Sequence, residues 1–162
     1  MSFTREFNGV LAFAQHLLVL KVAVREAEHK ALEQALVILE DDAVGQIGHY
    51  QGAAGPYPAW APLAESTEVE KARLGYQADA PLLREGDLQK SFSHQVNGDE
   101  GVVGSTSDVM PYHEFGTSKM PPRPVLGPAL FHNRNKIDEL LGRALVEAIV
   151  GGKILSGYLE KF

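Results

Sequence analysis

The residues of this chain best suited to chemistry are His113 and Glu114, a base and an acid side by side. A helical zinc site of the metalloprotease type needs a second histidine four residues after the first, so that both imidazoles share one helix face. Position 117 is Thr, and Gly116 is expected to break a helix there. The spacing therefore argues against a metal site at this pair.

Arg123 offers Glu114 a structural role instead. A guanidinium matches a carboxylate in a bidentate pair, which would tie one arm of the surrounding loop to the other. We expect this pair, and we expect it to define the shape of the loop more than to add stability. Replacing Glu114 by Ala would then leave Arg123 uncompensated, at a cost of roughly 3 kcal/mol or more.

The rest of the sequence contains no familiar catalytic or metal-binding pattern. No two of the six histidines have i, i+3 or i+4 spacing, so a metal cluster would require tertiary contacts. A nucleophile elbow and a phosphate-binding glycine loop are both missing. We therefore expect no enzyme, no metal and no cofactor. A small metal-dependent enzyme centred on His113, Glu114 and Arg123 is the less favoured alternative.

Helix breakers surround the acid and the base. Gly116 follows them closely, and the stretch from Met120 to Pro128 holds four prolines, which favour extended backbone at and before each ring. A loop built in this way is expected to hold a fixed shape. Upstream, the proline- and aromatic-rich segment 49–63 is expected to be a second loop, which Trp60 and Leu63 anchor to the core.

The sequence of the loop from Tyr112 to Pro128 resembles that of a known family, the small neck or tail-completion proteins of long-tailed bacteriophages and prophages. These proteins are also called minor tail components or virion morphogenesis proteins, and their loop is similar to H-E-F-G-T followed by P-x-R-P-F-L-G-P-A. Four further blocks agree in order: Trp60-Ala61-Pro62-Leu63 with Thr67 and Lys71, Pro81-Leu82, Gly86-Asp87-Leu88 with Ser91-Phe92, and Val103-Gly104-Ser105. The resemblance covers residues 24–150. The sequence departs from the family pattern at two positions: Val125 stands in place of a usual Phe, and Tyr112 lies directly before His113. The first departure leaves open how the space of the larger side chain is filled, and the second leaves open how the loop is aligned.

The resemblance implies a non-enzymatic structural protein of the virion, located in the neck or tail and present in the host cytoplasm before assembly. Copies would form a ring, sixfold in the virion, between the head connector or head-completion proteins and the tail terminator or tail-tube protein. A tail terminator or a connector adaptor is the alternative within this class. The expected interface residues in the loop are Tyr112, His113, Glu114, Phe115, Gly116, Thr117, Pro122, Arg123, Pro124 and Leu126.

Composition sets limits on the partners. Fifteen basic against twenty-one acidic residues give a formal charge of −6, whereas tight sequence-specific DNA binding needs concentrated Lys and Arg. A DNA-binding accessory factor is thus disfavoured, and DNA would pass a channel of this protein without specific binding. The apolar stretch from Val10 to Val24 is interrupted by polar residues and falls short of the ~18 residues that a membrane span needs. We expect no membrane partner.

The periodicity predicts one α+β domain over residues 1–162, with a small antiparallel sheet packed against a long N-terminal helix and a C-terminal helix. The long helix is predicted from Val24 to about Gly48, preceded by a shorter helix capped by Asn8. A capping box at Thr67 and Glu70 predicts a helix over 68–74. Asn97-Gly98 predicts a hairpin turn, and Pro128 predicts the start of a closing helix that ends at Gly151-Gly152. Segments 1–20 and 152–162 are expected to be mobile.

Overall fold

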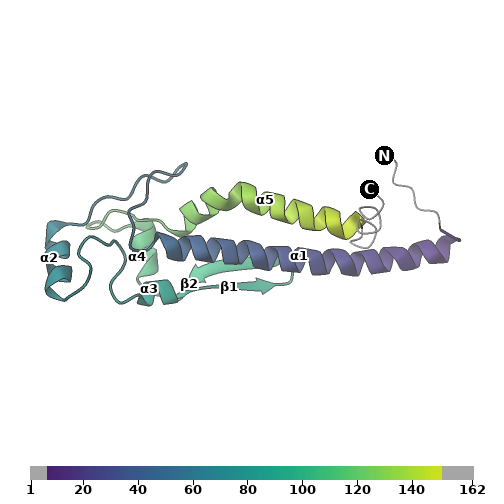
Figure 1. Cartoon of the computed structure of the whole chain (residues 1–162), viewed down its shortest axis with the longest axis horizontal. Coiled ribbons are helices and arrows are strands. Elements are labelled where there is room, and N and C mark those ends of the chain that lie inside the picture. Colours follow the sequence, from purple (N-terminus) through teal and green to yellow (C-terminus); the bar gives the residue numbers. More distant parts are fainter. Residues whose placement is uncertain (1–6, 151–162) are drawn as a thin grey trace, which may run out of the picture.

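The computed structural model describes residues 7–150, and the chain forms an elongated α+β structure along one long helix. A two-stranded antiparallel sheet and a C-terminal helix both pack against this helix, as the sequence predicts (Figure 1). The short helices and the proline-rich loops gather at one end of the molecule (Figure 1). The predicted Gly-Gly helix stop and the tail 152–162 lie outside the described residues.

The long helix is α1, Val10–Gln46, and it is continuous. The prediction of two helices is therefore wrong, because no proline and no glycine other than Gly45 interrupts this stretch. Asn8 is not its N-cap; Gly9 occupies that position without a side-chain cap. The buried side chains of α1 begin at Ala31 and lie on one face of the helix, mostly at three- and four-residue steps: Ala31, Ala35, Leu36, Leu39, Ala43 and Gln46. The N-terminal half of α1 is helical without contributing to the core.

The sheet is a hairpin of β1, Phe92–Asn97, and β2, Glu100–Ser105. Its register pairs Phe92 with Ser105 and Asn97 with Glu100, so the two-residue turn is Gly98-Asp99, one residue later than predicted. The left-handed φ of 64° falls on Gly98. Gly101 lets β2 approach α1 closely, since a Cβ at this position would lie 2.8 Å from the Leu36 side chain.

The closing helix is α5, Leu126–Val150, which runs along α1 (Figure 1). It begins two residues before Pro128, which occupies the first turn as expected. Polar contacts align the two helices. The Asn133 amide donates to the Asp42 carboxylate at 2.6 Å, and the Gln46 amide donates to the Val125 carbonyl at 3.1 Å. These bonds set the start of α5 against the end of α1.

Three short helices complete the fold: α2, Glu65–Arg73; α3, Asp87–Lys90; and α4, Met110–Phe115. The predicted capping box is wrong, because α2 starts earlier, after Ala64, and Thr67 lies inside its first turn. The predicted loop at 112–117 is partly wrong as well, since Tyr112 to Phe115 belong to α4. Pro111 suits this helix because a proline in the first turn lacks only an N–H that would be unpaired there.

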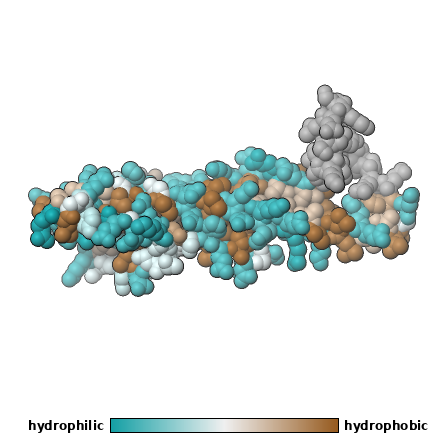
Figure 2. Space-filling model, turned by 60° about the horizontal axis from the view of Figure 1, so that its bottom comes forward, coloured by the Kyte–Doolittle hydropathy of each residue, from teal (hydrophilic) through white to brown (hydrophobic). Residues whose placement is uncertain are grey.

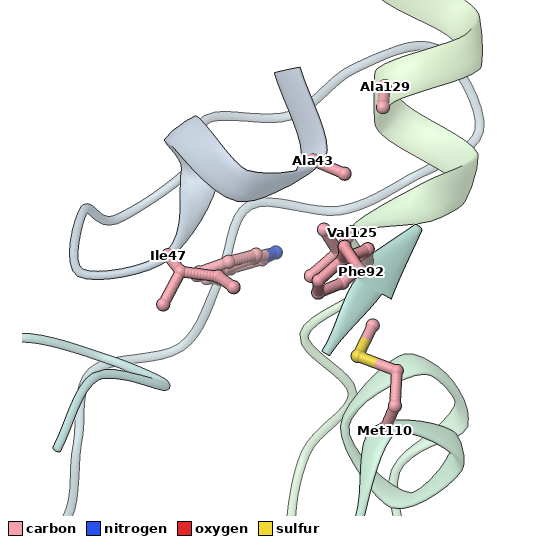
Figure 3. Close-up of a cluster of buried hydrophobic side chains, with 7 residues drawn as sticks. Ala43, Ile47, Phe92, Met110, Val125 and Ala129 are labelled. Atoms are coloured by element: carbon pink, nitrogen blue, oxygen red, sulfur yellow. The ribbon is translucent and has the colours of Figure 1, made fainter. Parts of the chain in front are cut away.

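The core lies where these elements meet the C-terminal end of α1. Figure 3 shows Val125 and Phe92 between the end of α1 and Met110 of α4. The cluster consists of Ala43, Ile47, Trp60, Phe92, Met110, Val125 and Ala129. Val125, which stands where the phage family that the loop resembles usually has Phe, is completely buried. The smaller side chain thus sits within a closed core, and the 112–128 segment is attached to that core through it.

Candidate functional site

Glu114 holds the start of α5. Its carboxylate accepts hydrogen bonds from the backbone N–H groups of Val125, Leu126 and Gly127, at 2.7, 3.2 and 3.2 Å. The first N–H groups of a helix have no partner within the helix, and the positive end of the helix dipole favours a carboxylate. Glu114 therefore acts as a distant N-terminal cap that links α4 to α5.

The turn between these helices is built to make this reach possible. Gly116 has φ 72°, and a Cβ there would lie 2.8 Å from the Pro122 nitrogen. Thr117 and Met120 pair in an isolated antiparallel bridge, which folds the chain back on itself. The Arg123 N–H then donates to the His113 carbonyl at 2.7 Å. The breaker-rich sequence does fix a shape, although part of that shape is helical.

Arg123 does not pair with Glu114, so this prediction is wrong. Its guanidinium donates to the carbonyls of Ala61 and Pro62, at 3.0 to 3.3 Å, and only 5% of the residue is exposed. Both groups find backbone partners instead of each other: the helix start offers unpaired N–H groups, and the extended 61–62 segment offers unpaired carbonyls. Arg123 thus attaches the 49–63 loop to the segment before α5.

His113 is half-buried, and its Nδ1 is buried without a hydrogen-bond partner in the described structure. Burial, and secondarily the charge of Arg123, lower the pKa of His113. The residue is therefore favoured in its neutral form. Within residues 7–150, no group of three or more His, Asp or Glu side chains is arranged to hold a metal ion.

Trp60 anchors the 49–63 loop as predicted. It is buried, and its indole Nε1–H donates to the Pro124 carbonyl at 3.0 Å. Leu63 is only half-buried, and its N–H donates to the Tyr50 hydroxyl. The two loops therefore hold each other in place through Trp60 and Arg123.

The expected interface residues divide into two groups. Tyr112, Phe115, Thr117 and Pro122 are exposed, and Phe115 is 81% exposed. The others serve the interior or the turn: His113, Glu114, Gly116, Arg123, Pro124 and Leu126 are half-buried or buried. Only the first group is free to contact another molecule without rearrangement.

A hollow that the sequence did not predict lies beside the turn between α4 and α5. It has a volume of about 500 Å³ and opens between α2, the 80–84 segment and the 119–123 segment. Lys71, Arg84, Lys119 and Arg123 contribute to its wall, and we call it the cationic hollow. These residues are far apart in sequence, so no local pattern reveals that they share one space.

Comparison with protein families, curated proteins and solved structures found no match to this chain. The phage resemblance thus stays a prediction from the sequence. Among residues 7–150, no helix combines the length and the apolar character needed to cross a membrane.

Proposed function

We propose that this chain is a structural protein of a phage or prophage neck, which forms a ring between the head connector and the tail tube without catalysing a reaction. Two lines of support come together: the ordered sequence blocks described above, and a surface suited to assembly. The proposal places the protein in the virion, with the exposed part of the 112–122 segment and the projecting end of α1 as contact surfaces.

The apolar N-terminal half of α1 is the observation that carries the proposal. None of residues 10–30 is buried, although many are large and apolar. Among the large apolar residues of this half, those that are 46% or more exposed are Val10, Leu11, Phe13, Leu17, Leu18, Val19 and Val22. Figure 2 shows apolar patches at this end of the molecule. Exposed apolar side chains gathered at one end of a molecule in this way typically mark a protein contact.

The acid and the base of the 113–123 segment support a structural role. The Glu114 oxygens accept from three backbone N–H groups, and the Arg123 guanidinium donates to two carbonyls. Groups committed to the backbone in this way shape the loop. A loop of fixed shape next to exposed Tyr112 and Phe115 is well suited to repeated contact with a neighbouring copy.

The test is the mass of the full chain in solution by light scattering, alone and mixed with the connector and tail-tube proteins encoded beside its gene. The proposal predicts a ring or a stack when those proteins are present. A stable small oligomer that ignores both partners would refute it.

A pair of variants connects this test to α1. Leu11→Gln with Leu18→Gln replaces two exposed leucines seven residues apart, on one helix face, by a residue with similar helix propensity. Burying a leucine contributes roughly 1.5–3 kcal/mol, so the double variant should weaken assembly by about two to four orders of magnitude. Val69→Gln with Val102→Gln changes two similarly exposed apolar residues elsewhere and should leave assembly unchanged.

A further inference from the structure

The cationic hollow concentrates positive charge in an acidic protein. Four of the fifteen Lys and Arg residues line it, in a chain whose formal charge is −6. Among the described residues that form its wall there is no Asp or Glu. Arg84 has an exposed ion pair with Glu70, at 3.3 Å, whereas the other three cations have no carboxylate within 4.0 Å in residues 7–150.

Two of these cations are buried. Lys71 and Arg123 are 3% and 5% exposed, and the partners of both are backbone carbonyls. Carbonyl groups satisfy the hydrogen bonds of a buried cation without neutralising its charge, which is costly to remove from water. Asp79 and Glu68 act on Lys71 only from beyond ion-pair distance. An anion in the hollow would supply the missing negative charge.

The backbone around the hollow is under strain. Leu82, which lines it, has φ 63°, a left-handed conformation that a bulky residue other than glycine rarely adopts. Such outliers persist where the surrounding structure enforces them, and they concentrate at ligand sites. Burial and the nearby Arg84 charge also lower the pKa of Lys71, so a negative charge placed beside it would favour its charged form.

The remaining wall is largely apolar. Leu63, Leu83 and Met120 lie between the cations, together with prolines of both loops. A compact inorganic anion would leave this apolar surface unfilled in a space of about 500 Å³. An anionic group attached to an apolar body would use both features, because the cations fix the charged end and the apolar wall covers the rest.

We propose that the cationic hollow binds an organic carboxylate, with Lys71, Lys119 and Arg123 around the carboxylate group and the apolar wall around its carbon chain. The ligand is either a free small acid or an acidic side chain of a second copy of this chain. The inference does not depend on the proposed neck function.

Amide NMR of the ¹⁵N-labelled full chain tests the proposal with N-acetyl-leucine as the probe. N-acetyl-leucinamide, which has the same body without the charge, is the matched control, and inorganic phosphate tests charge alone. We expect N-acetyl-leucine to shift the backbone amide signals of Leu63, Lys71, Leu82, Lys119, Met120 and Arg123, which line the hollow. N-acetyl-leucinamide should leave these signals unchanged. Equal shifts with the uncharged amide, a response to phosphate alone, or no response to any probe would each overturn the proposal.

Variants assign the effect to the hollow and identify the source of the ligand. Lys119→Glu changes an exposed residue of the wall and should weaken N-acetyl-leucine binding about tenfold, whereas Lys136→Glu makes the same charge change on α5 and should not alter it. Equal affinity in both variants would refute the site.

Light scattering distinguishes the two sources of the ligand. If the ligand is a side chain of a second copy, N-acetyl-leucine and Lys119→Glu will both lower the mass measured by light scattering at high protein concentration. An unchanged mass assigns the hollow to a free acid.

Discussion

Replacing Glu114 by Ala should destabilise the protein through the start of α5. The substitution leaves the N–H groups of Val125, Leu126 and Gly127 without their acceptor. Val125 is completely buried, so its unpaired N–H should cost about 1–3 kcal/mol, and losing the carboxylate at the helix start should cost about another 1 kcal/mol. The total is about 3 kcal/mol. For a chain of 162 residues this lowers the unfolding temperature by roughly 6–12 °C.

Urea denaturation followed by circular dichroism measures this loss, with two companion variants. Glu114→Gln keeps one acceptor oxygen but removes the charge, so it should lose about half as much stability. Glu139→Ala removes a carboxylate from the exposed surface of α5, where its only ion pair within residues 7–150 is with Arg143 at 3.9 Å, and it should cost about 0.5 kcal/mol or less. If Glu114→Ala is no more destabilising than Glu139→Ala, the capping argument is wrong.

Three further predictions concern the same region. The folded state holds His113 neutral with a lowered pKa, so the stability that His113 contributes is complete above pH 6.5 and is lost on acidification, because the unfolded chain takes up the proton first. As the pH is lowered from 8 to 5, the urea midpoint should therefore fall less steeply for His113→Gln than for the unchanged protein. Parallel pH profiles would contradict this. Trp60→Phe leaves the Pro124 carbonyl without its donor and should cost about 1–3 kcal/mol in the same assay, while an unchanged midpoint would show that the bond adds nothing. Gly116→Ala places a Cβ against neighbouring backbone at φ 72° and should cost more than about 2 kcal/mol. Gly104→Ala, which has open space around its Cβ, should have little effect on stability. If thermal melts show that Gly104→Ala is the more destabilising of the two, the argument from backbone strain at Gly116 is wrong.

The regular elements could be predicted from the sequence because their signals are local. The alternation from Phe92 to Val96 and the glycine after Asn97 define a hairpin, and its observed turn differs by one residue. The break expected before Val24 was wrong for a physical reason. The apolar pattern changes near Val24 because only the second half of the helix is buried, whereas the helical backbone runs on without interruption.

The site could be predicted only in part. The breaker residues indicated a fixed shape for the 112–128 segment, and Trp60 was correctly predicted to anchor the separate 49–63 loop. The partners of Glu114 and Arg123 were not predictable, because both are backbone groups and every residue of the chain offers such groups. The short helix α4 was missed since six residues carry little propensity signal, and tertiary contacts such as the burial of Met110 stabilise it.

The continuity of α1 has a consequence for how its two halves exchange amide hydrogens with water. The whole helix of 37 residues would be about 55 Å long, yet buried side chains begin only at Ala31. Amides in the second half can exchange only when the core opens, while those of residues 10–30 can exchange through local fraying. Protection should therefore rise along a single helix from its start towards Gln46. A partner that covers residues 10–30 would slow the exchange of their amides and make protection more uniform along the helix. Hydrogen exchange along α1 can therefore show whether a partner is bound and which residues of the helix it covers.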